Sequence, residues 1–156
     1  MMTFSYNNVL TDPDKYVEDI LSGVFIDVET EVGVFKNIQP RGADQLSDIV
    51  TSTFPHFSVS MNFVRMSPLN QEEPNFIHKD DMHGQKTIIL YLNKVYPDGY
   101  GTTIYTDDDE PMLINRGRYN SLFMFDSNAR HSRNIKENFG YGDSSRLVQV
   151  MFLKYN

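Results

Sequence analysis

The chain has 156 residues, of which 40% are hydrophobic and 13% aromatic, so it is long enough for one domain with its own buried core. The absence of cysteine excludes disulfides, thiolate metal sites and a cysteine nucleophile. A net charge of −7 disfavours binding to nucleic acid through phosphate contacts. Because the sequence has no long apolar run and no signal-peptide pattern, we expect no membrane span and, by default, a cytoplasmic location.

The first part of the chain predicts two helices with a strand between them. One helix begins at Thr11-Asp12-Pro13, where a polar N-cap precedes a proline, and ends at Ser22-Gly23. Alternating apolar residues predict a strand from Val24 to Val34. A second helix is expected from about Gly42 to Phe54, because its apolar residues repeat at helical spacing.

From Phe57 onward the sequence consists of short β-forming runs separated by turns. These runs are rich in β-branched and aromatic residues and are bounded by Gly, Pro, Asn or Asp. The expected strands are Phe57–Met66, Lys86–Asn93, Thr102–Thr106, Pro111–Asn115, Ser121–Phe125, His131–Lys136 and Arg146–Leu153. The pattern predicts a mainly β, α+β chain. We expect a single domain over residues 1–156, with supporting elements in 1–56 and a β-sandwich or barrel in 57–153.

A His-x-Asp triplet, His78-Lys79-Asp80, is the first candidate for chemistry. Residues two apart in an extended segment point to the same side, so His78 and Asp80 can reach one ion while Lys79 faces away. Two histidines and one carboxylate form the facial triad that binds Fe(II). His131, which follows a tight polar turn, is the candidate third ligand. The triplet alone has an ordinary alternative, a surface histidine beside a solvated acid.

Arg146 is the second candidate, because it begins a strongly apolar strand near the end of the chain. A charged residue in such a place needs a partner when it is partly buried. A guanidinium binds a carboxylate in bidentate fashion, which suits the distal end of a dicarboxylate cosubstrate. The alternative is an ordinary arginine at the rim of a strand.

Together these residues resemble the iron(II)- and 2-oxoglutarate-dependent dioxygenases, in particular their prolyl-4-hydroxylase-like branch. That branch has His-x-Asp, a strand ending in Tyr-Leu-Asn, a Gly-Gly-Glu-Thr-like turn, a distal His and then an Arg or Lys. The corresponding residues here are His78-Lys79-Asp80, Tyr91-Leu92-Asn93-Lys94, Tyr100-Gly101-Thr102-Thr103, His131 and Arg146. The ordered set, within the region from Phe57 to Leu153, is far more specific than any one of its parts.

The resemblance implies a double-stranded β-helix (jelly roll) with N-terminal support helices. It implies that His78, Asp80 and His131 are the iron ligands and that Arg146 binds the C5 carboxylate of 2-oxoglutarate. Tyr91 stands where a family tyrosine touches the same carboxylate, and a core tyrosine satisfied by a backbone partner is an equal alternative. The implied activity is hydroxylation of an aliphatic C–H bond with O2, a peptidyl proline being one target. Succinate and CO2 would be the co-products, and the partner a small-molecule or peptide substrate.

Three features depart from the family pattern. Met66 stands near the position of a tyrosine that often contacts the cosubstrate, so the contact to the C1 carboxylate is unassigned. The interval from His131 to Arg146 is longer than usual, so residues 138–144 are expected to form a longer hairpin tip. The turn has Tyr100-Gly101 in place of paired glycines.

Two alternative functions are kept. In the first, the same cofactors serve an enzyme that demethylates an alkylated nucleic-acid base. Such enzymes usually have a second arginine six residues after the first, where this chain has Phe152. In the second, a cupin-like metal-binding isomerase or binding protein uses the histidines without 2-oxoglutarate.

For the other polar residues near the motifs, exposure to solvent is the simpler interpretation. His83 is expected in a solvated loop, and Asp81 has the wrong parity to replace Asp80 as a ligand. The run from Asp107 to Glu110 is expected to be a solvated hairpin tip. The arginines near the motifs either line the mouth of the site and meet an anionic substrate or are solvated; they are Arg65, Arg130 and Arg133.

Overall fold

The structure, a computed structural model, describes residues 3–40, 44–134 and 137–156. The elements of these ranges are, in order, β1 (Phe4–Tyr6), α1 (Pro13–Leu21), β2 (Ile26–Thr30), β3 (Gly33–Gln39), α2 (Asp44–Thr53), β4 (Phe57–Ser67), η1 (Asp81–His83), β5 (Lys86–Tyr91), β6 (Gly101–Tyr105), β7 (Pro111–Arg116), β8 (Ser121–Asp126), β9 (Arg130–Arg133), η2 (Gly142–Ser144) and β10 (Arg146–Tyr155). No helix among the described residues is long and apolar enough to cross a membrane.

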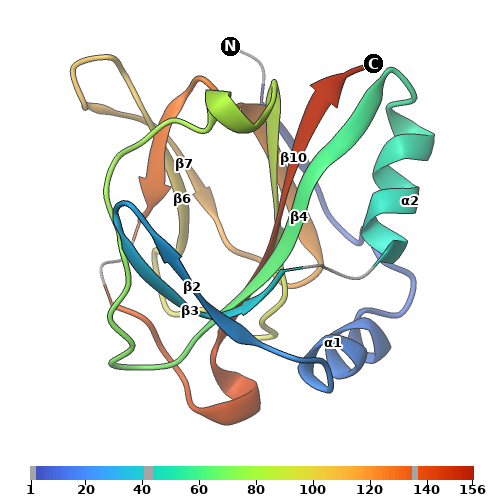
Figure 1. The fold of residues 1–156 in the computed structure, drawn as a ribbon, viewed down its shortest axis with the longest axis vertical. Coiled ribbons are helices and arrows are strands. Elements are labelled where there is room, and N and C mark those ends of the chain that lie inside the picture. The colour runs from blue at the N-terminus through green and yellow to red at the C-terminus, as the bar shows by residue number, and fades with distance from the viewer. Residues whose placement is uncertain (1–2, 41–43, 135–136) are drawn as a thin grey trace.

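The strands form two antiparallel sheets (Figure 1). The larger sheet has the order β1-β8-β5-β10-β4-β3-β2, and the smaller has the order β7-β6-β9. β10 is central in the larger sheet, because it pairs with β4 from Arg146↔Ser67 to Tyr155↔Phe57 and with β5 from Val148↔Tyr91 to Leu153↔Lys86. The arrangement confirms the predicted mainly β jelly roll with N-terminal helices.

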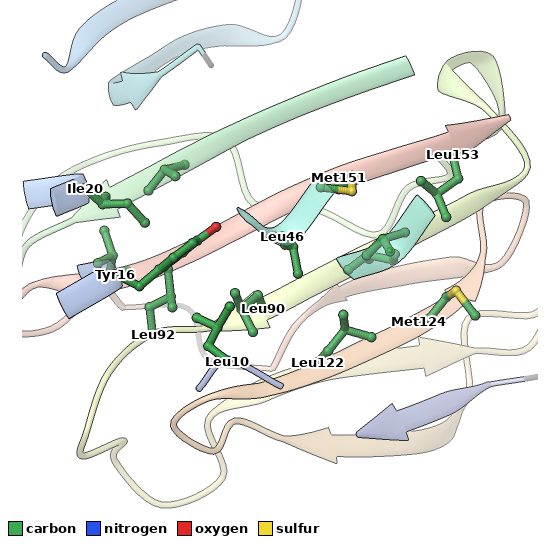
Figure 2. Close-up of a cluster of buried hydrophobic side chains, with 14 of the residues drawn as sticks. Leu10, Tyr16, Ile20, Leu46, Leu90, Leu92, Leu122, Met124, Met151 and Leu153 are labelled. Carbon is green, nitrogen blue, oxygen red and sulfur yellow. The ribbon is translucent and has the colours of Figure 1, made fainter. Parts of the chain in front are cut away.

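Both helices lie on the side of β4 and β10 that faces away from the smaller sheet (Figure 1). Each buries a pair of residues four positions apart, Tyr16 and Ile20 in α1 and Leu46 and Val50 in α2. These side chains pack on the larger sheet in what we call the outer cluster (Figure 2). Its buried members are Leu10, Tyr16, Ile20, Leu46, Val50, Phe57, Val64, Ile88, Leu90, Leu92, Leu122, Met124, Leu147, Met151 and Leu153.

A second group of buried side chains, the inner cluster, lies on the opposite face of the larger sheet and includes Ile104 of the smaller sheet. Alternation along β10 produces both clusters, since Leu147, Met151 and Leu153 belong to the outer one while Val148, Val150 and Phe152 belong to the inner one. The remaining inner members are Tyr91, Ile104, Phe123, Phe125 and Ala129. Arg146 has the parity of the inner set, so its side chain belongs to the space where the candidate ligands also lie.

Two expectations about the N-terminal part need correction. The single strand expected from Val24 to Val34 is wrong, because the chain reverses and forms the hairpin β2–β3. Gly33, at φ +136°, supports the reversal, and apolar alternation on both sides of the turn concealed it. β1, which pairs with β8, was not expected, because three residues are too few to show a period.

The other expected elements occur close to their predicted positions. The second helix and the strand from His131 to Lys136 correspond to α2 and β9, although residues 42–43 and 135–136 lie outside the described ranges. The hairpin tip expected at residues 138–144 contains the short η2 turn. The segment 68–77, which connects β4 to His78, contains no helix or strand.

Candidate functional site

His78 and His131 are brought together by their main chains. The N–H of each donates to the carbonyl of the other, at 3.0 Å from His78 and 2.9 Å from His131, which forms an isolated antiparallel bridge. We call this pair of hydrogen bonds the histidine rung. Asp80 is held in turn by its own N–H, which donates to the Ser127 carbonyl at 2.8 Å. The backbone therefore sets the spacing of these three residues.

The side chains of His78, Asp80 and His131 converge on one point. One ligand atom from each lies within 4.8 Å of the other two. The Asp80 carboxylate faces both rings, with Oδ1 3.4 Å from Nε2 of His78 and Oδ2 3.0 Å from Nε2 of His131. Lys79 is exposed, as the alternation of an extended segment requires. The structure thus brings together the three residues that the sequence nominated as ligands.

The other nitrogen of each ring decides the tautomer. Nδ1 of His78 lies 2.8 Å from the Phe76 carbonyl, and Nδ1 of His131 lies 3.0 Å from the Ala129 carbonyl. Because a carbonyl only accepts, Nδ1 carries a proton in both rings, so a metal ion would bind at Nε2 in place of the proton that Nε2 donates to Asp80. Two imidazole nitrogens and one carboxylate are a donor set that fits Fe(II).

The charges of the site favour a bound cation. Burial raises the pKa of the Asp80 carboxyl, but hydrogen bonds from His131 and His78 outweigh burial and hold that pKa below its usual range. Burial lowers the pKa of His78, and its contacts with Asp80 and the Phe76 carbonyl outweigh burial and raise it. Asp80 is therefore ionised at neutral pH, and a metal ion would take the place of protons on the ring nitrogens.

Arg146 lies at the start of β10 with a side chain that is 8% exposed. Its guanidinium lies over the Tyr100 ring, 5.8 Å from the centroid. Neither Nε nor Nη1 has a hydrogen-bond partner among the described residues, and Nη1 lies 4.0 Å from Oε1 of Glu73. Buried N–H groups in this state fit a carboxylate ligand.

Tyr91, at the end of β5, is buried in the inner cluster. Its hydroxyl shares a hydrogen bond with the Thr102 hydroxyl at 2.7 Å and accepts one from the Asn115 amide at 3.4 Å. Its partners are side chains of β6 and β7 rather than backbone groups. Burial raises the pKa of the Tyr91 phenol, so the hydroxyl keeps its proton at neutral pH.

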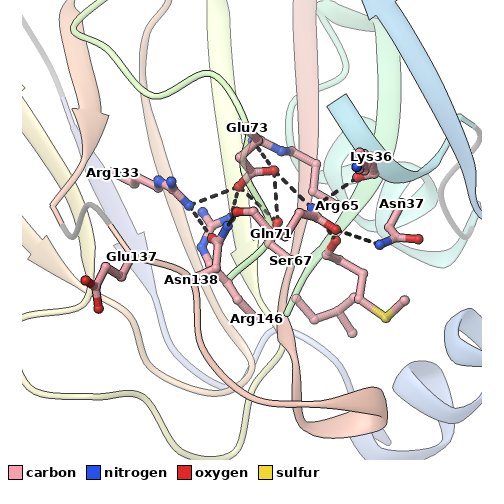
Figure 3. Close-up of polar contacts among 12 residues, drawn as sticks. Lys36, Asn37, Arg65, Ser67, Gln71, Glu73, Arg133, Glu137, Asn138 and Arg146 are labelled. Atoms are coloured by element: carbon pink, nitrogen blue, oxygen red, sulfur yellow. Dashed lines mark hydrogen bonds and ion pairs between the residues drawn. The ribbon is translucent and has the colours of Figure 1, made fainter. Parts of the chain in front are cut away.

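A buried carboxylate that the sequence analysis did not single out, Glu73, lies among three arginines (Figure 3). Its side chain is 0% exposed and contacts Arg65 of β4, Arg133 of β9 and, more distantly, Arg146 of β10. Of the three arginines left open between a lining role and solvation, Arg65 and Arg133 are thus largely buried. Arg130 instead pairs at the surface with Asp109, at 2.6 Å.

The strand parity of β4 explains why Arg65 rather than Met66 belongs to the site. Met66 packs against the outer cluster, on the face away from the histidines. Arg65 has the same parity as Phe63, which packs against the inner cluster. Met66 therefore offers no contact to the cosubstrate, and the residue that binds the C1 carboxylate stays unassigned. The alternation of Phe63, Val64 and Arg65 was the signal that pointed to Arg65.

The remaining candidates are not among the described residues whose ligand atoms converge, although the His83 N–H donates to the Asp80 carbonyl at 2.9 Å. The His83 ring stacks on Phe152 at 4.8 Å between centroids, and Asp81 is exposed. The Asp107–Glu110 run forms the exposed connection between β6 and β7. Phe152, which stands where base demethylases usually have an arginine, is a buried member of the inner cluster.

A surface cavity of about 980 Å³ lies beside the arginine-bound carboxylate. One wall is formed by residues of the 69–77 segment, including Glu73, Phe76 and Ile77. The other side includes Ser132 and Arg133 of β9, together with Tyr105, Asn134, Glu137 and Asn138. Phe76, one of the lining residues, has its ring 5.2 Å from the His78 ring between centroids, whereas none of the three candidate ligands itself lines the cavity.

Comparisons with known proteins establish the fold. No family model and no curated protein matches the chain. Among solved structures, a prolyl hydroxylase from Trichoplax adhaerens, in complex with a hypoxia inducible factor peptide fragment, matches with a TM-score of 0.68 at 18% identity, over 98% of this chain and 83% of that chain. The viral collagen prolyl hydroxylase of Paramecium Bursaria Chlorella virus-1 gives 0.61 at 10% identity, covering 100% and 90%. HygX from Streptomyces hygroscopicus, with nickel, 2-oxoglutarate and hygromycin B bound, gives 0.62 at 9%, covering 99% and 83%. The chain therefore has the fold of the prolyl hydroxylases and other 2-oxoglutarate- and iron-dependent oxygenases.

Proposed function

We propose that the protein is an Fe(II)- and 2-oxoglutarate-dependent dioxygenase that hydroxylates an aliphatic C–H bond. The observation that carries the proposal is the convergence of His78, Asp80 and His131, whose ligand atoms lie within 4.8 Å of one another inside a fold of this kind. The unpartnered N–H groups of buried Arg146 give independent support, because they suit the carboxylate of the cosubstrate. When bound, iron and 2-oxoglutarate supply the oxidising chemistry, with O2 consumed and succinate and CO2 released.

The residues of the chain have distinct roles in this proposal. His78 and His131 present Nε2 because each Nδ1 is held by a carbonyl, and Asp80 supplies the negative charge that balances the metal. Arg146 binds the C5 carboxylate through its free donors. If Thr102 donates to Tyr91, the Tyr91 hydroxyl retains its own proton to donate to that carboxylate.

For the substrate we propose a small molecule or a peptide, with a peptidyl proline as the first target to test. Two of the matched folds are prolyl hydroxylases, one of them with a bound peptide, and another holds hygromycin B. The net charge of −7 and the apolar residue at position 152 both disfavour an alkylated base in nucleic acid. The cavity lined by Phe76 and Ser132 provides space for such a substrate, and the Phe76 ring lies 5.2 Å from the ring of the candidate ligand His78.

The test is an anaerobic titration of the metal-free protein with Fe(II) and then 2-oxoglutarate. We expect the weak visible charge-transfer band that marks chelation of 2-oxoglutarate by protein-bound iron. Asp80→Ala should abolish the band, and Arg146→Ala should require at least about tenfold more 2-oxoglutarate, since a lost charge-assisted hydrogen bond of 1.5–3 kcal/mol corresponds to a factor of ten or more. Asp81→Ala, an exposed neighbour, is the matched control and should behave like the wild type.

Tight metal binding without any band would contradict the proposal. That result would favour the cupin-like alternative, which uses the histidines but not 2-oxoglutarate.

A further inference from the structure

Three arginines from three separate strands point at one carboxylate in the interior (Figure 3). Nη2 of Arg65 lies 3.1 Å from Oε2 of Glu73, and Nη1 of Arg133 lies 2.9 Å from Oε1. Arg146 is the third, with Nη1 4.0 Å from Oε1. The side chains of the arginines are 19%, 9% and 8% exposed in this order, and that of Glu73 is 0% exposed. The arrangement is a binding site for a carboxylate, occupied by a carboxylate of the chain itself.

The cluster carries an excess of positive charge. Three guanidinium groups surround a single carboxylate, so these four residues have a net charge of +2. Buried charges are costly unless each is paired and hydrogen-bonded. Burial accordingly lowers the pKa of Arg65 despite the opposing effect of Glu73. A carboxylate ligand has the sign of charge that this cluster attracts.

Arg146 is the arginine that Glu73 satisfies least. Its distance to Glu73 is the longest of the three, and Nε and Nη1 have no hydrogen-bond partner among the described residues. Nε of Arg65 is likewise without a partner in the described part of the chain. Glu73 thus uses only part of the hydrogen-bonding capacity that the cluster offers a carboxylate.

We infer that Arg65 and Arg133 act with Arg146 as the binding site for the distal carboxylate of the cosubstrate, and that Glu73 occupies this site until the cosubstrate displaces it. The inference rests on the proposed function and deepens it. The exchange replaces one carboxylate by another on the same guanidinium groups, so it creates no new buried charge. Glu73 is therefore an internal competitor of 2-oxoglutarate.

The segment that carries Glu73 is attached to the rest of the chain by few backbone hydrogen bonds among those that the structure describes. Residues 68–77 contain no helix or strand, and polar contacts connect them to the rest of the chain. The Ser67 hydroxyl and the Gln71 amide donate to Glu73, at 3.0 and 3.3 Å. The Leu69 N–H donates to the Gly140 carbonyl at 2.9 Å, and the Asn138 amide donates to the Gln71 carbonyl at 2.9 Å. The adjoining surface cavity provides room for the displaced side chain.

Displacement of Glu73 would move residues that directly adjoin the candidate metal ligands His78 and His131. The segment ends at Ile77, directly before His78 of the histidine rung. Arg133 is two residues after His131 on the same strand and therefore on the same face. Binding of the cosubstrate and opening of residues 68–77 are thus coupled through elements that adjoin the site on both sides.

The test compares the affinity of anaerobic, Fe(II)-loaded protein for 2-oxoglutarate by titration calorimetry. Glu73→Gln removes the competing charge, and the expected result is a dissociation constant lower by about tenfold. Glu72→Gln makes the same charge change at an exposed neighbouring position and should leave the constant unchanged. Arg65→Gln should raise the constant by about tenfold. Unchanged or weaker binding by Glu73→Gln would overturn the inference, because it would make Glu73 a fixed counter-ion that orders the arginines.

A second measurement needs no variant. It tests the displacement of Glu73 by 2-oxoglutarate even if Glu73→Gln folds poorly. Amide hydrogen exchange of residues 68–77 is followed in the Fe(II)-loaded wild type with and without 2-oxoglutarate. Displacement of Glu73 predicts several-fold faster exchange in this segment when 2-oxoglutarate is present, whereas slower or equal exchange would overturn the inference. The two proposals fail differently: no 2-oxoglutarate binding by any form refutes both, whereas wild-type binding without these differences refutes only the role of Glu73.

Discussion

Glu73 carries its charge in the interior, and this links the stability of the fold to pH. Burial raises the pKa of its carboxyl, but the guanidinium groups of Arg65, Arg146 and Arg133 outweigh burial and lower it below the ordinary value of 4.5. A carboxyl whose pKa is depressed by folding contributes stability above its unfolded pKa. That contribution is lost as the pH falls through the folded value.

We therefore predict that the stability difference between the wild type and Glu73→Gln depends on pH. At pH 7 the variant should be less stable by about 3 kcal/mol, since it leaves buried arginines without their counter-ion. Below pH 4.5 the difference should shrink, because the carboxyl of the unfolded wild type takes up a proton first, and it should disappear as the pH falls through the lowered pKa of the folded state. Urea unfolding at pH 7, 5, 4 and 3 measures this, with Glu72→Gln as control. A difference that stays constant across this range would contradict the prediction.

At this scale the sequence was informative wherever a residue lay on a periodic element. His78 and Asp80 share a face because they are two apart in an extended segment, and Arg146 was found because it begins an apolar strand. Glu73 lies in a segment without a period, so its burial depends on the contacts of distant strands. The placement of such a residue requires the tertiary structure.

At the scale of elements, β10 contributes buried side chains to both faces of the larger sheet. It supplies apolar residues to the outer cluster and to the inner cluster alternately, and it pairs with β4 and β5 on either side. Both helices pack on the outer face (Figure 1). The helices and the candidate ligands therefore lie on opposite sides of the larger sheet.

A core substitution in α2 should therefore lower stability without changing metal affinity. Leu46 is 0% exposed in the outer cluster, and Leu46→Ala should cost about 2–5 kcal/mol through lost burial and the cavity that remains. Urea unfolding gives the stability change, and Fe(II) titration of the folded variant gives the affinity. Gln45→Ala, exposed on the same helix, should leave both unchanged. A large loss of Fe(II) affinity in folded Leu46→Ala would show that the two faces are coupled.

Most elements could be predicted because their apolar patterns are long enough to identify a period. The exceptions have physical causes. β1 has three residues, and the β2–β3 hairpin reverses at a turn across which alternation continues. The parity of β4 was available in the sequence, yet only the position of the outer cluster showed that Val64 and Met66 face away from the site.

For the molecule as a whole, the described clusters are complete without a metal ion. The outer and inner clusters bury their apolar side chains on the two faces of the larger sheet, and the histidine rung consists of backbone hydrogen bonds. A metal bound by His78, Asp80 and His131 would add its binding energy to a structure already formed, in contrast to zinc fingers, which fold only with metal. Apolar patterning predicted a mainly β sandwich or barrel for the same reason, whereas the jelly roll was implied by the resemblance that the motifs carry.

We predict that metal removal lowers the melting temperature but leaves the protein folded. At a free Fe(II) concentration of about 100 times the dissociation constant, binding should stabilise the fold by about 2.7 kcal/mol. For a chain of this size that corresponds to a rise of about 5–10 °C, which excess EDTA should reverse. Far-ultraviolet circular dichroism at 20 °C should be the same with and without EDTA. Loss of the β-sheet signal on chelation would contradict the prediction.

The histidine rung also bears on how this chain can change over evolutionary time. The rung uses main-chain groups of residues 78 and 131, and Asp80 is held by its own N–H. Any residue except proline can form these hydrogen bonds at the three positions, because they use the main-chain N–H and carbonyl groups. Single substitutions can therefore exchange one ligand for another, or remove it, while the spacing of the positions is retained. The ligand set of the site is free to diversify on an unchanged backbone, so new metal chemistry is accessible to this chain in single mutational steps.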